Sequence, residues 1–216
     1  MNSRVILVSD DRSSLRSPDT LLWPDAACMR GIHTGEWTAH IFEYAMSFEG
    51  NMTQVRELAA ANGVGVLHPH GALATDPPGL VVCDVDSTVT RTEAIDLLAE
   101  CAGKADEVRE ITARAMVGEL DFTQSLYARV RCLEGLHIGA LEEAWKATVI
   151  TPGTAELVAA AHDVGAAVGL VSGGFTAIVD PLAEQIRADF AASNELEIVD
   201  NHLTGRVVGD IIDRAA

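Results

Sequence analysis

The chain has 216 residues, enough for one or two domains. Apolar residues make up 48% and charged residues 22%, a balance that allows a packed core and excludes wholesale disorder. Lys and Arg total 15 against 32 Asp and Glu, which gives a formal net charge of −17. This charge argues against non-specific nucleic-acid binding and against attraction to anionic membranes, because both require a basic surface.

Cysteine usage and hydropathy indicate a cytoplasmic protein with reduced thiols. The four cysteines have no C-x-x-C spacing, so neither a zinc site nor a disulfide framework is predicted. They are Cys28, Cys83, Cys101 and Cys132. No apolar run reaches the 18 residues of a membrane span, and the segment 1–10 turns acidic, unlike a secretory signal.

The first 70 residues contain a few weak strand and helix signals. The predicted strands are Val5–Val8, Trp37–Phe42 and Val64–Leu67, and the predicted helix is Asn51–Asn62 with Val55, Leu58 and Ala59 on one face. We predict a small α+β domain over residues 1–70. The segment 71–79, GALATDPPG, follows as a linker because its prolines and glycines interrupt regular structure.

Residues 80–216 show a strand, helices, strand, helix order, which predicts an α/β domain with a parallel sheet and helices on its faces. The predicted strands, Leu80–Cys83 and Ala166–Val171, are apolar enough for burial on both faces. The predicted helices are Thr92–Ala102, Glu107–Met116, Phe122–Leu133, one opened by Thr151 as N-cap with Pro152 in its first turn, and one from about Thr176. Glu195–Val199 and Thr204–Val208 are predicted to pair across Asp200-Asn201.

Two aspartates follow the first apolar strand directly. Asp84 and Asp86 stand two residues apart where ligands bind in open parallel sheets, at a strand's carboxyl end. Their charges repel unless a cation or proton is present, and Mg²⁺ suits such a carboxylate pair. Asp84 could then attack phosphorus, and Asp86 could protonate the leaving alcohol and activate water. Surface polarity at a strand end is the alternative; an EF-hand is excluded because Val89 and Ile95 occupy its Gly and Glu positions.

A second strand end carries Ser172-Gly173-Gly174 before a helix. Glycines let backbone N–H groups converge on an anion, and the serine hydroxyl adds a donor. The alternative is an ordinary glycine-rich strand-to-helix turn. Two such ends in one βαβ domain favour a joint phosphate and metal site.

Four segments of the chain resemble the phosphoserine phosphatases of the haloacid dehalogenase superfamily. They are DVDSTVTRTEAIDLLAECAG, ITARAMVGELDFTQSLYARVRCLEGL, TPGTAELVAAAHDVGAAVGLVSGGFT and ASNELEIVDNHLTGRVVGDI. The resemblance implies a Rossmann-like sheet of haloacid dehalogenase type over 80–216, with a helical cap at about 91–150. It implies Mg²⁺ held by Asp84 and Asp86, with Asp84 as nucleophile and Asp86 as acid/base, and a phosphoryl group bound by Ser172 and the Gly173 backbone.

The resemblance also assigns substrate contacts in the cap. Glu93 would meet the substrate ammonium, Arg129 would pair with its carboxylate, and Met116 and Phe122 would close the pocket. The residues alone leave simpler alternatives open: helical core for Met116 and Phe122, a solvated helix face for Arg129, and a first-turn carboxylate for Glu93. The implied substrate is a small phosphomonoester, O-phospho-L-serine, hydrolysed in the last step of serine biosynthesis.

The family's third-motif lysine and fourth-motif GDGxND turn have no match in residues 1–216. The two lysines, Lys104 and Lys146, both fall in the predicted cap, and nothing places Arg206 or Arg214 at the phosphoryl group. We therefore expect an α/β domain that is incomplete at its C-terminus, with Leu80–Cys83 left as an unpaired edge. A non-catalytic phosphoserine-binding homologue, or a phosphatase for another small metabolite, is the alternative function. By analogy with many relatives, residues 1–70 would form an amino-acid-sensing, ACT-like domain; a module for packing or homodimer formation is the alternative.

The expectation of an incomplete enzyme has a direct test. We expect purified residues 1–216 to release phosphate from O-phospho-L-serine with Mg²⁺ at least about a hundredfold more slowly than a full-length phosphatase, because a positioned transition-state donor is missing. Turnover near that of a full-length enzyme would contradict it.

Overall fold

The structure, a computed structural model, describes residues 3–9, 27–33, 38–44, 52–69 and 71–213. The chain divides into two compact units, Met1–Pro77 and Pro78–Ala216. The division falls inside the segment 71–79, whose described residues include a short 3₁₀ turn, η1 (Gly71–Ala74). Each unit is described by itself.

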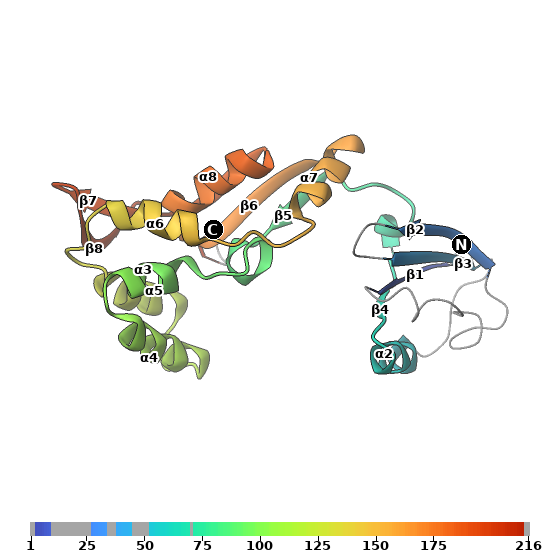
Figure 1. The fold of residues 1–216 in the computed structure, drawn as a ribbon, viewed down its shortest axis with the longest axis horizontal. Coiled ribbons are helices and arrows are strands. Elements are labelled where there is room, and N and C mark those ends of the chain that lie inside the picture. The colour runs from blue at the N-terminus through green and yellow to red at the C-terminus, as the bar shows by residue number, and fades with distance from the viewer. Residues whose placement is uncertain (1–2, 10–26, 34–37, 45–51, 70, 214–216) are drawn as a thin grey trace. The chain divides into compact units, whose positions relative to one another are not determined.

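The smaller unit contains an antiparallel sheet and a helix (Figure 1). Its elements are β1 (Ser3–Ser9), β2 (Ala27–His33), β3 (Thr38–Tyr44), α2 (Met52–Ala61) and β4 (Gly65–Leu67). The strand order is β2-β3-β1-β4, the order of ferredoxin-like α+β domains. The predicted strands and helix of this region are confirmed, and β2 is an addition to them. The side chains of Val55 and Leu58, predicted for one helix face, lie outside the described residues.

The larger unit contains a sheet of order β5-β6-β7-β8, and the predicted α/β class is confirmed. β5–β6 and β6–β7 are parallel, and β7–β8 is an antiparallel hairpin. The strands are β5 (Leu80–Cys83), β6 (Ala167–Phe175), β7 (Phe190–Val199) and β8 (His202–Val208). The predicted hairpin turn is confirmed, with Asp200 and Asn201 both at positive φ, as in a two-residue type I′ turn.

The helices of this unit fall into two groups (Figure 1). α7 (Thr154–Asp163) and α8 (Thr176–Ile186) pack against β6. The other four lie between β5 and α7 in sequence, within the predicted cap range. They are α3 (Ala94–Cys101), α4 (Ala105–Met116), α5 (Phe122–Arg131) and α6 (Gly139–Ala147).

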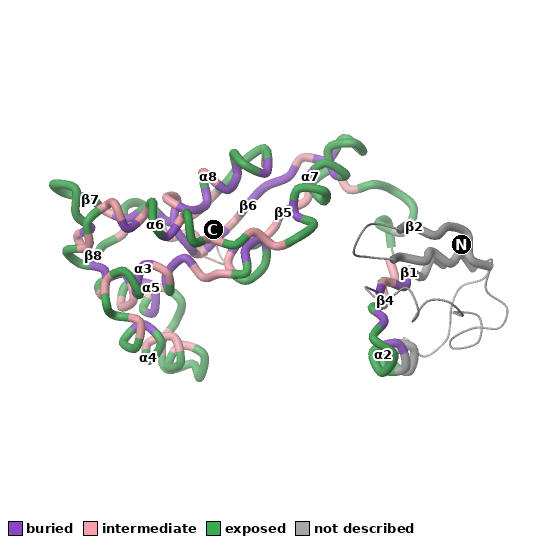
Figure 2. Tube along the Cα trace, viewed as in Figure 1, coloured by how far each residue is buried: buried purple, intermediate pink, exposed green. Residues whose placement is uncertain are grey.

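Two apolar clusters hold these layers together. One joins the cap helices to the hairpin and α8, through buried residues such as Leu98, Leu126 and Leu203. The other lies between α7, α8 and β6, and includes Leu170 and Leu182. Figure 2 shows the result along the chain, with β6 buried over most of its length.

The strand β5 is more exposed than its apolar sequence predicts. Leu80 is 53% exposed and Val82 is 51% exposed, so the expected burial on both faces is wrong in this structure, whereas the expected unpaired edge at Leu80–Cys83 is confirmed among the described strands. The reason is topological, because β5 is the outer strand of the described sheet and pairs only with β6.

The start of α7 also differs from the sequence prediction. Thr151 does not cap the helix; Gly153, at φ +92°, precedes the first helical residue, Thr154. The Thr151 hydroxyl instead donates to the Thr88 carbonyl oxygen at 2.8 Å, and its own carbonyl oxygen accepts from the Thr154 hydroxyl at 2.8 Å. A contact across 63 residues of sequence therefore replaces the local cap.

Two crossing segments connect the cap to the sheet. Thr90 and Ile150 form an antiparallel bridge, and the Arg91 N–H donates to the Val149 carbonyl oxygen at 2.7 Å. Thr90 is 1% exposed, and its hydroxyl donates to the Thr92 carbonyl oxygen at 2.8 Å. The cap thus enters and leaves the sheet through one short two-stranded ribbon.

Leu98 at the centre of the cap core provides a stability test. It is fully buried, so Leu98→Ala should lower the free energy of unfolding by about 2–5 kcal/mol through lost burial and a residual cavity. Leu157→Ala, at a leucine that is 52% exposed, is the matched control and should cost less than about 1 kcal/mol. Urea unfolding of the full chain measures both, and equal losses would contradict the assigned core.

Candidate active site

The two aspartates predicted from the sequence lie in a tight loop at the end of β5. Asp84 follows the strand, and the next residues form the π-helical turn η2 (Val85–Val89), with Ser87 at φ +56°. Val85 and Val89 are buried under this turn, at 1% and 6% exposure. The buried valines anchor the loop, and Asp84 and Asp86 on either side of Val85 line the adjacent cavity.

A cavity of about 280 Å³ lies over this loop. It is lined by Asp84, Asp86, Glu93, Ile95, Phe122, Leu126, Arg129, Gly173, Gly174 and Phe175. The lining comes from the two strand ends that the sequence predicted to act together and from cap helices α3 and α5. Five of the predicted site side chains therefore share one small space.

Asp86 is the most constrained carboxylate of the cavity. Its Oδ1 accepts from the Ala94 N–H at 2.9 Å, and the Ser172 hydroxyl hydrogen-bonds it. Burial raises the pKa of Asp86, and the charges of Glu93 and Asp84 raise it further, against the two hydrogen bonds. A carboxyl with a raised pKa holds its proton more readily than an ordinary aspartate, as a general acid must.

Asp84 is more exposed and is held from one side. The Thr88 hydroxyl donates to its Oδ2 at 3.0 Å, which leaves the other carboxylate oxygen toward the cavity. The Thr88 carbonyl in turn accepts from Thr151 at the ribbon of the cap. The sequence analysis named no role for Thr88. Its position two residues after Asp86, in the same loop, was the feature that could have suggested a contact with the aspartates.

The segment Ser172–Gly174 approaches these carboxylates closely. It leaves the β6–β7 ladder, whose register shifts between Val171 and Phe175. A Cβ at Gly174 would lie 2.6 Å from Asp86 Oδ2, and one at Gly173 would lie 2.7 Å from the Phe122 ring. A side chain at either position would force Asp86 or Phe122 to move.

Ser172 is 2% exposed, and its hydroxyl oxygen accepts from the Gly174 N–H at 2.8 Å. It borders a second, smaller cavity of about 180 Å³, which shares Phe122 and Gly173 with the first. Asp84, Asp86 and Ser172 are thus brought together, as the predicted phosphate site requires.

Arg129 and Glu93 lie on the cap side of the cavity. Burial lowers the pKa of the Arg129 guanidinium, while the charges of Glu93, Asp96 and Asp86 raise it. Guanidinium remains charged in proteins, so Arg129 presents a half-buried cation to the cavity. Glu93 accepts from the Ser87 hydroxyl at 2.5 Å, which links the aspartate loop to the cap. Arg129 is therefore not on a solvated helix face.

Of the two predicted pocket-closing residues, one is at the cavity. Phe122 lines it and lies against Gly173. Met116 ends α4 at 84% exposure and is not among the lining residues. Helical core is therefore excluded for Met116, because α4 ends there and Val117 beside it is 74% exposed as well. Contact of Met116 with a substrate stays a prediction.

The donor set fits a magnesium ion with few protein ligands. Within the described ranges, no group of three His, Cys, Asp or Glu side chains is arranged to hold a metal. Asp84 lies close enough to Asp86 for its charge to raise the pKa of Asp86. Mg²⁺ commonly binds one or two carboxylates together with water and phosphate oxygens, so this pair suits it.

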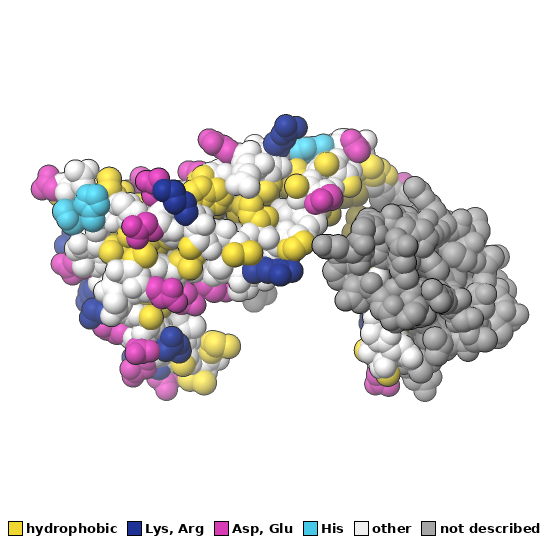
Figure 3. Space-filling model, viewed as in Figure 1, with side chains coloured by type: hydrophobic (Ala, Val, Ile, Leu, Met, Phe, Trp, Pro, Cys, Tyr) yellow, Lys and Arg dark blue, Asp and Glu magenta, His cyan; other side chains and the backbone are white. Residues whose placement is uncertain are grey.

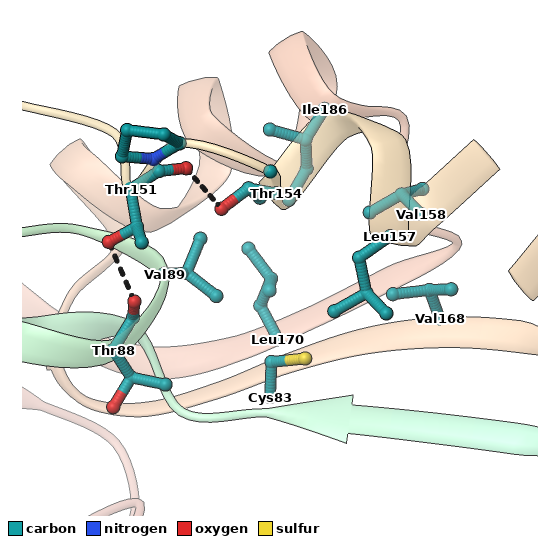
Figure 4. Close-up of a pocket in the computed structure, with 12 residues that line it drawn as sticks. Cys83, Thr88, Val89, Thr151, Thr154, Leu157, Val158, Val168, Leu170 and Ile186 are labelled. Atoms are coloured by element: carbon teal, nitrogen blue, oxygen red, sulfur yellow. Dashed lines mark hydrogen bonds between the residues drawn. The ribbon is translucent and has the colours of Figure 1, made fainter. Parts of the chain in front are cut away.

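A further cavity of about 240 Å³ lies between η2, β6, α7 and α8 (Figure 4). Its lining is mostly apolar, and it shares no residue with the carboxylate cavity. Figure 4 shows the hydrogen bonds of Thr151 with Thr88 and Thr154 at its edge. Its lining contains no charged side chain.

On the face seen in Figure 3, Lys and Arg side chains are scattered among acidic ones rather than gathered into a basic patch. No helix of the described residues is long and apolar enough to cross a membrane.

Comparisons with known proteins agree with the predicted resemblance. Residues 81–216 match the family model described as haloacid dehalogenase-like hydrolase. The chain is 50% identical over 157 residues to a phosphoserine phosphatase from Streptomyces coelicolor, covering 73% of this chain and 38% of that protein. It is 45% identical over 136 residues to a phosphoserine phosphatase from Lactococcus lactis, covering 63% of each.

Among solved structures, an unliganded probable phosphoserine phosphatase from Vibrio cholerae matches with a TM-score of 0.76. It is 32% identical, and the match covers 97% of this chain and 64% of that one. The chain therefore spans between about two fifths and two thirds of the length of these relatives.

The raised pKa of Asp86 predicts a pH-dependent stability. The folded protein binds this proton more tightly than the unfolded chain, so the ionised carboxylate destabilises the fold above about pH 4, increasingly up to the folded pKa. Without metal, Asp86→Asn should raise the unfolding midpoint at pH 7.5 by about 2–4 °C for each kcal/mol of relieved penalty.

The difference should vanish toward pH 3.5, where the carboxyl is protonated in both states. Thermal unfolding in EDTA measures it, with Asp163→Asn, at an exposed carboxylate of α7, as the matched control. A wild-type chain more stable than Asp86→Asn at pH 7.5 would contradict the assigned burial.

Proposed function

Because this chain belongs to the haloacid dehalogenase-like hydrolase family, we propose that it hydrolyses O-phospho-L-serine to L-serine and phosphate through a phosphoaspartyl intermediate. The observation that carries the proposal is the composition of one cavity. Asp84 and Asp86 meet the Ser172–Gly174 segment on one side, and Arg129 and Glu93 on the other. Relatives that carry the name phosphoserine phosphatase support the same substrate.

The substrate's three charged groups match this arrangement. Its phosphate would lie against the Ser172 hydroxyl and the glycine backbone, its carboxylate would pair with Arg129, and its ammonium with Glu93. A planar guanidinium binds a carboxylate with two parallel hydrogen bonds, which favours Arg at this place. Phe122, which lines the cavity against Gly173, would exclude water from the phosphate; we keep Met116 as a second closing residue.

The proposed chemistry transfers the phosphoryl group twice. An Asp84 carboxylate oxygen forms a bond to phosphorus while the bond from phosphorus to the serine oxygen breaks, and the proton of Asp86 goes to that oxygen. Asp86, now ionised, removes a proton from water, whose oxygen attacks phosphorus and releases phosphate and free Asp84. Burial, the main cause of the raised Asp86 pKa, favours the protonated acid in the chain without metal, and a bound Mg²⁺ would act in the opposite direction.

Magnesium is the proposed cofactor, with Asp84 and Asp86 as its protein ligands. Phosphatases of this family are generally metal-dependent. When bound, the ion would neutralise charge on the phosphate and let the anion approach two carboxylates. The thiol state of Cys83, Cys101 and Cys132, all free, supports a reducing compartment, and we propose the cytoplasm and serine biosynthesis as the setting.

For residues 1–70 we propose an ACT-like domain that also mediates homodimer formation. The ferredoxin-like strand order supports the domain type, and the outer strands β2 and β4 of its open sheet supply edges for pairing. Sedimentation of the full chain distinguishes a dimer from a monomer, and a monomer across the micromolar range would contradict the pairing.

Substrate recognition is tested by binding, which does not depend on turnover. Isothermal titration should show tighter binding of O-phospho-L-serine than of phosphoethanolamine, which lacks the carboxylate. Arg129→Ala should remove this preference and weaken phosphoserine binding by about 10- to 100-fold, the range for a hydrogen-bonded charge pair. Arg131→Ala, at an exposed arginine of the same helix, should bind like wild type.

Asp84→Asn should retain binding but abolish any magnesium-dependent phosphate release. Binding without turnover in the wild-type chain would favour the non-catalytic alternative. Unchanged phosphoserine affinity in Arg129→Ala would overturn the assigned substrate.

A further inference from the structure

A buried asparagine lies behind the phosphate-binding segment, outside the cavity itself. Asn194, in β7, is 1% exposed and is not among the residues that line the cavities at the site. Its Nδ2 donates to the Gly173 carbonyl oxygen at 3.0 Å and reaches the Ile212 carbonyl oxygen at 3.5 Å. Its Oδ1 accepts from the Ile212 N–H at 2.9 Å. Both ends of the amide are therefore used.

The hydrogen bond to Gly173 acts on one peptide plane. The Gly173 carbonyl and the Gly174 N–H belong to the same rigid unit and point to opposite sides of it. Asn194 holds the carbonyl side, and the Ser172 hydroxyl oxygen accepts from the N–H side at 2.8 Å. The plane is thus fixed at both edges.

This fixation determines where the Ser172 proton is available. A serine hydroxyl has one proton to donate, and accepting from Gly174 N–H restricts where that proton points. The hydroxyl is directed to Asp86, at the cavity where a phosphate would lie. A Gly-Gly pair has the backbone freedom to rotate this plane, and close packing at both Cα atoms excludes any side chain that would restrict it. The restraint comes from Asn194 instead.

We propose that Asn194 is a positioning residue for phosphoryl binding, which orients the Gly173–Gly174 peptide and through it the Ser172 hydroxyl. This inference rests on the proposed function, because it assigns Ser172 and the glycine backbone to the phosphate. Asn194 itself contacts neither substrate nor metal. It also ties the phosphate-binding segment to Ile212, beyond the end of β8.

Asn194→Asp removes the Nδ2 donor but adds a carboxyl that can carry charge. The variant keeps the shape and the acceptor for Ile212 N–H, but it places an oxygen where Nδ2 donates to Gly173. We expect the Gly174 amide resonance to move in ¹H–¹⁵N spectra and the affinity for inorganic phosphate, titrated with Mg²⁺, to fall about tenfold or more. Asn194→Leu, which is uncharged and has no donor, should show the same losses. The Gly118 amide, in the cap, should stay in place and report an intact fold. Asn201→Asp, in the exposed hairpin turn, is the matched control and should leave both readouts unchanged.

The outcomes separate this inference from the proposed function. If wild-type Ser172, Gly173 and Gly174 show no response to phosphate, the proposed phosphate site fails, and the role of Asn194 falls with it. If wild type responds and Asn194→Asp responds with equal affinity and an unmoved Gly174 amide, Asn194 alone is overturned.

A measurement on the wild-type protein tests the inference even if Asn194→Asp does not fold. The Asn194 Nδ2 protons should exchange slowly with solvent, because they are buried and bonded to Gly173 and Ile212. Their resonances should shift when phosphate is titrated. Rapid exchange, or no shift at saturating phosphate, would contradict the positioning role.

Discussion

Three carboxylates share one small cavity with one arginine, and this concentration of negative charge constrains the rest of the site. Asp84, Asp86 and Glu93 line the cavity, and Arg129 is the cation among its described lining residues. The cost of the arrangement is visible at Asp86, whose pKa is raised by burial and by both neighbouring carboxylates. Such a cluster is stable only with protons, hydrogen-bond donors or a metal ion. Each of these also serves the proposed phosphoryl transfer.

The surrounding structure supplies the donors in a specific way. The Ala94 N–H at the start of α3 binds Asp86, the Thr88 hydroxyl binds Asp84, and the Ser87 hydroxyl binds Glu93. These hydrogen bonds come from the loop and from the first turn of the cap. The same few residues therefore hold the carboxylates and join the cap to the sheet. A movement of the cap would displace the Ala94 N–H and so change its hydrogen bond to Asp86.

Local patterns predicted the elements that depend on local interactions. The apolar spacing of α3, α4 and α5 and the turn at Asp200 and Asn201 could be predicted because helices and tight turns are determined by near neighbours. Thr151 was assigned wrongly as a cap because its hydroxyl bonds Thr88, a partner distant in sequence. The exposure of β5 follows from its place at the edge of the described sheet, which the unmatched fourth motif predicted and the apolar residues of the strand did not.

At the site, too, some features could be predicted from local sequence and others depend on residues distant in sequence. The spacing of Asp84 and Asp86 and the Ser172-Gly173-Gly174 segment predicted a shared cavity, because parallel strand ends meet at one edge of a sheet. Arg129 and Glu93 were predicted at the site only through resemblance, since the residues alone allowed a solvated helix face for Arg129 and a first-turn carboxylate for Glu93. The sequence did not predict a role for Asn194, because its hydrogen-bond partners, Gly173 and Ile212, are distant in sequence and meet it only in the folded structure.

In the proposed site, one phosphate binds between Asp84, Asp86 and Ser172. A crystal structure of Asp84→Asn with O-phospho-L-serine and Mg²⁺ tests it most directly. We expect phosphorus about 3–3.5 Å from the side chain at position 84, phosphate oxygens on Ser172 and Gly173, and the substrate carboxylate on Arg129. A ligand bound elsewhere, or a phosphate turned away from position 84, would contradict the account.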